Sequence, residues 1–153
     1  MKEFGPFRLI DGIVRYRKEE GIVTRCKLPA RRTLIAEYGL PAMLLEYAAQ
    51  SCALMSRIED LDATDCFLGK VKRIDFHNAP SVQTSVLANV ARITHGSELS
   101  RYTGEVETSG GLPVAHFDLL VCTVRALGGN TDIRSKYWKN YLDGLLGKCT
   151  DVA

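Results

Sequence analysis

The sequence has no long apolar run and no excess of charge of one sign. No segment approaches the run of about 18 apolar residues that crosses a bilayer, and the first residues lack the basic start and apolar stretch of a signal peptide. A cytoplasmic location is therefore expected. Twenty Lys and Arg against eighteen Asp and Glu leave a formal charge of +2, so the basic stripe of a nucleic-acid-binding protein is not indicated.

Motifs for cross-linking, metal binding and phosphate binding are also missing. The five cysteines are odd in number and scattered without a Cys-x-x-Cys spacing, which argues against a disulfide framework or a zinc knuckle. Neither a phosphate-binding glycine loop nor a cluster with metal-ligand spacing occurs. What is there is ordinary: 153 residues, 46% of them hydrophobic and 25% charged, are typical of one soluble domain with a sufficient apolar core.

Hydrophobic periodicity divides the chain into strands and one long helix. Apolar residues alternate with period two after a turn-like segment at 18–21, which predicts an opening hairpin, and the same period returns later in the chain. The predicted strands after the hairpin cover residues 66–76, 82–93, 99–108 and 114–124. Over residues 39–58, apolar side chains recur at three- and four-residue spacing, which predicts a helix, and Pro41 suits its first turn.

This order of elements indicates an α+β fold, with one antiparallel sheet of about six strands wrapped round one long central helix. The free edge of such a sheet can pair with another chain, so a dimer is expected. We expect one domain over residues 1–127. Residues 128–153 are expected to form a C-terminal extension with a short amphipathic helix, in which Ile133, Tyr137, Tyr141 and Leu145 recur at four-residue spacing.

Glu46 is the sole carboxylate of the predicted helix and the first candidate for chemistry. A buried, unpaired carboxylate is costly, so Glu46 needs a partner, a cleft, or a pKa raised far enough for acid–base work. Gly39, Met43, Glu46 and Gln50 follow one line along the helix, and the free N–H groups at its start can stabilise negative charge on a carbonyl oxygen. Chemistry on an acyl group and a salt bridge to a second chain are both consistent with this pattern.

Two segments carry a resemblance to a known family. The stretch Leu40-Pro-Ala-Met-Leu-Leu-Glu-Tyr-Ala-Ala-Gln50, with Gly5-Pro-Phe-Arg-Leu-Ile-Asp11 upstream, resembles the hot-dog-fold (3R)-hydroxyacyl-acyl-carrier-protein dehydratases, especially the dehydratase-like proteins of aryl-polyene-type clusters. The resemblance covers about residues 5–125. It implies a hot-dog fold, a homodimer or a heterodimer with a related subunit, and an acyl substrate on the phosphopantetheine of acyl carrier protein or coenzyme A, with no other cofactor.

The resemblance also assigns roles to residues. Glu46 matches the catalytic carboxylate, and substrate binding falls to the start and polar edge of the helix, at Gly39, Leu40, Pro41 and Gln50.

The family's catalytic histidine has no counterpart at its usual place. Its His-Phe-Pro-Gly motif begins eight residues before the proline that matches Pro41, where this chain has Thr33. Among the three histidines, His77 at a predicted strand end is the candidate substitute, whereas His95 and His116 fit turn and surface roles.

Three functions stay open. The first is a dehydratase-like lyase of fatty acid or polyketide-type biosynthesis. The second is a thioesterase, whose helix carboxylate activates water or attacks the thioester without a histidine. The third is a non-catalytic subunit that supports a histidine-bearing relative.

Overall fold

The computed structural model describes residues 8–59, 65–124 and 131–149. In chain order its elements are β1 (Gly12–Arg17), β2 (Gly21–Lys27), the 3-10 helix η1 (Leu28–Arg31), α1 (Arg32–Tyr38), α2 (Leu40–Glu59), β3 (Asp65–Phe76), β4 (Ser85–His95), β5 (Leu99–Thr108), β6 (Pro113–Val124) and α3 (Thr131–Gly147). The predicted α+β class, the opening hairpin and the long helix are confirmed.

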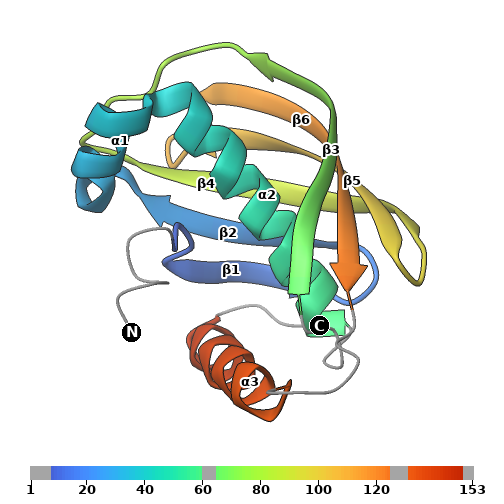
Figure 1. Ribbon diagram of the computed structural model, residues 1–153. Helices are drawn as coiled ribbons and strands as arrows, with labels where there is room; N and C mark the ends of the chain where they lie inside the picture. Colours follow the sequence, from blue (N-terminus) through green and yellow to red (C-terminus); the bar gives the residue numbers. More distant parts are fainter. Residues whose placement is uncertain (1–7, 60–64, 125–130, 150–153) are drawn as a thin grey trace.

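The strands form one antiparallel sheet in the order β1-β2-β4-β5-β6-β3, which curves around α2 (Figure 1). Close approach between neighbouring strands depends on glycine at one central position. A Cβ on Gly104 of β5 would collide with the carbonyl oxygen of Asn89 and with the ring of Phe117. The absence of a side chain there lets β4, β5 and β6 curl tightly over the helix.

The core lies between the concave face of the sheet and α2. Tyr47, Cys52 and Met55 of the helix are fully buried against side chains such as Phe117 and Leu119 of β6. This burial explains the apolar spacing along the helix, because these side chains share the face turned to the sheet.

Three buried hydroxyl groups connect α2 to the sheet and fix the position of the helix. The Tyr47 hydroxyl accepts a hydrogen bond from Thr24 Oγ1 of β2 at 2.9 Å, and Thr24 Oγ1 also lies 2.8 Å from Ser51 Oγ. All three residues are buried. Buried hydroxyls without partners are costly, so this arrangement favours one position of the helix over others.

Part of α2 is not covered within the single chain. Pro41, Ala42 and Glu46 at its N-terminal half are exposed. The sheet wraps only one side of the helix, and small side chains such as Ala42 need no cover. The exposed strip is where the candidate site lies.

The carboxylate of Glu59 holds the C-terminal end of α2 through several contacts. Glu59 accepts hydrogen bonds from the N–H of Glu19 at 2.6 Å and the hydroxyl of Tyr16 at 3.3 Å, and it forms an ion pair with Arg92. An acidic residue at a helix C-terminus opposes the helix dipole, so these contacts compensate for its position. They connect the helix to the β1–β2 hairpin and to β4.

Residues 28–38, where the sequence pattern predicts neither a helix nor a strand, are helical. η1 is followed directly by α1, and none of the seven residues of α1 is fully buried. α1 ends at Gly39, whose φ of 87° is strained for other residues and whose N–H donates to the carbonyl of Ile35 at 2.9 Å. The chain then starts α2 at once, so α1 sits over the beginning of the central helix (Figure 1).

The predicted C-terminal helix is present as α3 and packs beside β1 (Figure 1). Its Leu142 and Leu145 are buried, and the Tyr141 hydroxyl donates to the carbonyl of Ile10 at 3.3 Å. The side chains of Ile133 and Tyr137, the predicted boundary after residue 127 and the connector at 128–130 lie outside the described residues. Among the described helices, none is long and apolar enough to cross a membrane.

Candidate functional site

A mostly apolar groove opens beside the first turns of α2, at the exposed strip of the helix. It encloses about 270 Å³ and is lined by Leu9, Leu34, Tyr38, Ala42, Met43 and Glu46. Glu46 is the one charged residue of this lining and is exposed, whereas Met43 is buried. We call this feature the Glu46 groove. The sequence pattern predicts a partner, a cleft or a perturbed pKa for this carboxylate. The structure places Glu46 at the edge of a cleft.

Gln50 holds the carboxylate of Glu46 in place. Its Nε2 donates to Glu46 Oε1 at 3.0 Å, and its Oε1 accepts the backbone N–H of Leu9 at 2.9 Å. The two residues stand one turn apart on α2, as the predicted polar line requires. The side-chain amide thus joins the N-terminal segment to the candidate catalytic group.

The start of α2 contributes backbone N–H donors, but Gly39, which was expected to be one of them, is not available. The Gly39 N–H is already engaged by Ile35, so it is not a free donor. The N–H groups of Leu40 and Ala42 belong to the first turn, where an α-helix has no acceptor of its own to offer. Pro41 has no N–H. Leu40 and Ala42 therefore carry the first-turn N–H groups at this helix end.

None of the three histidines lines the Glu46 groove. His77 follows β3, is exposed, and donates its backbone N–H to the carbonyl of Val114. His95 Nδ1 lies 3.1 Å from Ser100 Oγ, and His116 Nδ1 lies 3.9 Å from a carboxylate oxygen of Glu105 on the sheet. Within one chain, the structure does not bring His77 to Glu46, and its catalytic role stays a prediction.

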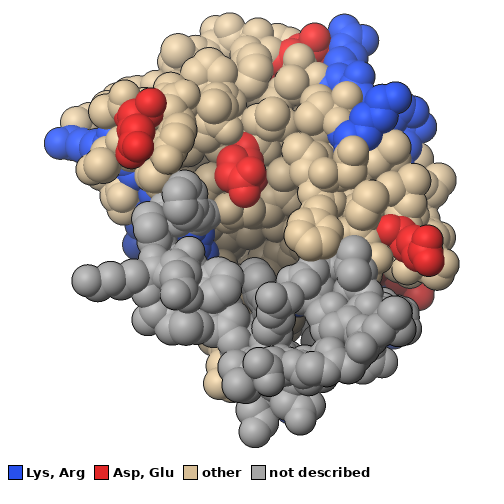
Figure 2. Space-filling model, in the orientation of Figure 1, with Lys and Arg blue, Asp and Glu red and all other residues tan. Residues whose placement is uncertain are grey.

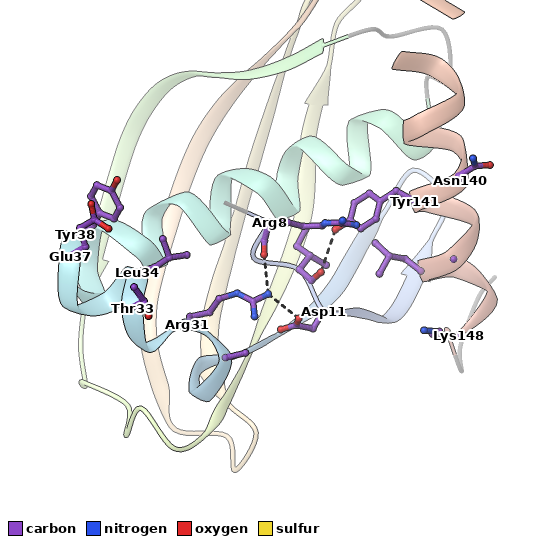
Figure 3. A pocket seen from close by; sticks show the side chains of 14 residues that line it. Arg8, Asp11, Arg31, Thr33, Leu34, Glu37, Tyr38, Asn140, Tyr141 and Lys148 are labelled. Carbon is purple, nitrogen blue, oxygen red and sulfur yellow. Dashed lines mark hydrogen bonds and ion pairs between the residues drawn. The ribbon is translucent and has the colours of Figure 1, made fainter. Parts of the chain in front are cut away.

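A second, larger cavity adjoins the Glu46 groove. It encloses about 730 Å³ between the segment before β1, the η1–α1 segment and α3 (Figure 3). We call it the Arg31 cavity. Leu34 and Tyr38 line both features, so α1 forms the shared wall. Its lining consists of Arg8, Ile10, Asp11, Ala30, Arg31, Thr33, Leu34, Glu37, Tyr38, Asn140, Tyr141, Gly144, Leu145 and Lys148.

Arg31 is the central polar group of this cavity. Its Nη2 donates to the carbonyl of Arg8 and to Asp11 Oδ1, both at 2.9 Å, and its side chain is 12% exposed (Figure 3). The guanidinium of Arg8 lies over the ring of Tyr141, 4.4 Å from its centroid. Thr33, where the dehydratases have histidine, also lines the cavity.

The buried thiols are not candidates for nucleophiles. Burial raises the pKa of Cys26 to about 12, and burial also raises the pKa of Cys52. Both are therefore neutral thiols near pH 7, and a neutral thiol is a poor nucleophile. The described residues contain no group of His, Cys, Asp and Glu placed to hold a metal ion.

Charged side chains are sparse on the face of the molecule that Figure 2 shows. On the face turned to the reader in Figure 2, acidic side chains are scattered and most basic ones gather toward the edges. A ligand approaching this face meets apolar and neutral groups with isolated carboxylates.

The sequence predicts Glu46, Gln50 and the start of the helix as candidate site residues. It does not predict the other side chains that line the groove. Leu9 and Leu34 carry no signal of their own, because they reach the groove from segments outside the predicted helix. The Arg31 cavity depends on contacts between residues near both ends of the described chain, which periodicity does not reveal.

No protein-family model and no curated protein matches this sequence. Solved structures do resemble it. The dehydratase heterocomplex ApeI:P from Xenorhabdus doucetiae has a TM-score of 0.64 at 12% identity, over 87% of this chain and 91% of that one. A Streptococcus mutans protein bound to acetyl CoA has a TM-score of 0.60 at 11% identity, over 74% and 88%.

A third structure is a hypothetical thioesterase with coenzyme A from Streptococcus pneumoniae, with a TM-score of 0.60 at 12% identity, over 84% of this chain and 99% of that one. Likeness at such low identity concerns the path of the backbone. Together with the six-stranded antiparallel sheet around α2, it shows that the chain has the hot-dog fold.

Proposed function

We propose that this chain acts on acyl thioesters at the Glu46 groove, as a dehydratase-like lyase. One observation carries the proposal: a carboxylate, held by Gln50, stands at the mouth of an apolar groove beside the start of a helix. The groove suits an acyl chain, the helix start suits a thioester carbonyl, and the carboxylate suits proton transfer next to it. The resemblance of the α2 sequence to the dehydratases supports the same reaction.

The chemistry requires only groups that the site offers. A β-hydroxyacyl thioester places its carbonyl oxygen near the N–H groups of Leu40 and Ala42, which makes its α-proton more acidic. Glu46 takes that proton, and a carbon–carbon double bond forms as the bond to the β-hydroxyl breaks. The same carboxyl group returns the proton to the departing hydroxyl, so water leaves and Glu46 is again a carboxylate. No bound cofactor is needed beyond the phosphopantetheine arm of the substrate.

The test follows the conjugated enoyl product formed from a β-hydroxyacyl pantetheine thioester. Because acid–base catalysis contributes about 10²- to 10⁴-fold, Glu46→Gln should lower kcat by at least about 100-fold. Glu98→Gln is the matched control, since Glu98 is an exposed turn residue that lines neither cavity. Equal rates for the wild type and Glu46→Gln would refute the assignment.

Hydrolysis of the thioester is the second candidate. The observation that favours it is the absence of any histidine from the groove lining, since hydrolysis needs only a carboxylate to activate water or to attack the carbonyl. In the same reaction mixture, hydrolysis releases a free thiol and dehydration does not. Thiol release without enoyl formation would select the thioesterase.

We also propose that β3 pairs with a second hot-dog subunit. β3 is an outer strand of the described sheet, and its Phe67, Leu68 and Phe76 are 53%, 38% and 45% exposed. An unpaired edge with exposed apolar side chains invites another strand. The partner is either a second copy or a related chain that supplies the missing histidine, in which case this chain is a supporting subunit.

Light scattering on the purified chain separates these partners. A homodimer that dehydrates the substrate alone would exclude the supporting role. Activity that arises only on mixing with a histidine-bearing relative would establish that role.

A further inference from the structure

The geometry points to an oxyanion-binding site in the Arg31 cavity, which takes a carboxylate or phosphate carried by the thioester substrate. This inference rests on the proposed acyl-thioester function and adds to it the chemical class of the substrate. The cavity lies against the Glu46 groove, with α1 as the shared wall, so one extended ligand can occupy both.

Arg31 has an incomplete set of hydrogen bonds. Its Nη2 has two acceptors, but its buried Nε has none, and it is the one buried side-chain polar atom without a partner among the described residues. Buried donors on a charged group nearly always find an acceptor. The hydrogen bonding of the Arg31 guanidinium is therefore incomplete among the described residues.

The guanidinium of Arg31 is also held in position without a ligand. Contacts to the carbonyl of Arg8 and to Asp11 hold it from one side, and Figure 3 shows the Arg31 side chain reaching from the η1–α1 segment toward the middle of the cavity. A donor group held in advance loses little conformational entropy on binding, and the planar guanidinium can bind two oxygens of a carboxylate or phosphate at once.

The lining of the Arg31 cavity carries more positive than negative charge. Arg8, Arg31 and Lys148 contribute three positive charges, against two carboxylates on Asp11 and Glu37. Among the described residues, Arg8 and Lys148 have no carboxylate partner, since Arg8 instead lies over the ring of Tyr141. The excess of one positive charge is balanced by an anionic ligand.

Two parts of an acyl thioester can provide such an oxyanion. One is the phosphate of the phosphopantetheine arm, and the other is a carboxylate at the far end of the acyl chain. Both would place the anion beside Arg31 and the thioester beside Glu46. In either case α3, through Tyr141 and Lys148, takes part in choosing the substrate.

The experiment measures binding of four probes by calorimetry: pantetheine, phosphopantetheine, butyryl-pantetheine and glutaryl-pantetheine. A charged hydrogen bond to Arg31 should make at least one anionic probe bind about tenfold more tightly than its neutral counterpart. A gain with phosphopantetheine alone identifies the carrier arm as the source, and a gain with glutaryl-pantetheine alone identifies the acyl chain.

Substitutions show which residues cause the tighter binding of the anionic probes. Arg31→Gln should abolish it, and Lys148→Gln, which changes an exposed side chain, should reduce it by about two- to threefold because a more distant charge contributes less. Arg32→Gln is the matched control, because Arg32 is exposed and does not line the cavity. Thermal unfolding of each variant shows that it is folded. If Arg31→Gln does not fold, the four probes and Lys148→Gln still decide.

The results distinguish failure of the oxyanion site from failure of the acyl-thioester function. Equal affinities for the anionic and neutral probes, or a gain that survives in folded Arg31→Gln, would overturn the oxyanion site and leave the acyl-thioester function standing. Failure of all four probes to bind, together with absence of turnover, would overturn both.

Discussion

Replacing Gln50 tests how the structure positions Glu46. Two hydrogen bonds of the side chain serve different purposes, one to the Glu46 carboxylate and one to the backbone N–H of the buried Leu9. Gln50→Ala removes both. Gln50→Glu keeps an acceptor for Leu9 but replaces the donor to Glu46 with a second carboxylate.

The expected magnitudes follow from these two contacts. A hydrogen bond to a charged group contributes about 1.5–3 kcal/mol, and the low end applies because water reaches the exposed Glu46, so kcat should fall about tenfold in Gln50→Ala. Leaving the Leu9 N–H without an acceptor should cost about 1–2 kcal/mol of unfolding free energy, which lowers Tm by about 2–8 °C at this chain length.

Gln50→Glu should separate the two effects. Its Tm should stay nearer to that of the wild type, because the Leu9 N–H still has an acceptor. A second carboxylate one turn away disfavours the ionised form of Glu46, so the acid limb of the pH–kcat profile should move to higher pH. Gln83→Ala, at an exposed glutamine, is the control.

The assays are thermal unfolding and kcat against pH. A Gln50→Ala variant with wild-type kcat, or a Gln50→Glu variant with an unshifted pH profile, would refute the positioning role.

Three further outcomes are expected. Tyr47→Phe should lower the unfolding free energy by about 1 kcal/mol, measured by urea denaturation, because Thr24 loses a buried acceptor; an unchanged midpoint would contradict this. Burial raises the pKa of Cys26 to about 12, so this thiol should resist alkylation at pH 8 until urea unfolds the chain, and labelling in native buffer would show the site to be open. Hydrogen bonding to Arg101 lowers the pKa of Asp118, so this pair should stabilise the fold above about pH 4 and cease to do so as the pH falls. Asp118→Asn should therefore show a smaller acid-induced fall in Tm than the wild type, and an equal fall would show that other groups control acid unfolding.

The sheet and the central helix could be predicted because their burial is one-sided and regular. The alternation of Val86, Ala88 and Val90 in β4 follows from their position on the concave face, where all three are buried. α1 could not be predicted for the converse reason. It has seven residues, buries none of them fully, and is too short to be stable without the chain around it.

The candidate site was predictable only where local pattern and chemistry coincide. Glu46 stands out as a carboxylate among apolar residues, and Gln50 follows from helical spacing. Arg31 looks like any exposed basic residue in the sequence. It is held by Arg8 and Asp11, which are about twenty residues away along the chain, so only the tertiary structure reveals these contacts.

The contact between α3 and the segment before β1 also orders events in time. Tyr141 and Ile10, which it joins, are 131 residues apart. At about 5–20 residues per second, the ribosome synthesises the second of these residues roughly 7–26 s after the first. Strands β1 and β2 and helix α2 are therefore synthesised several seconds before the part of α3 that lines the Arg31 cavity. A nascent chain would carry Glu46 and its groove first and gain its selectivity for anionic substrates last.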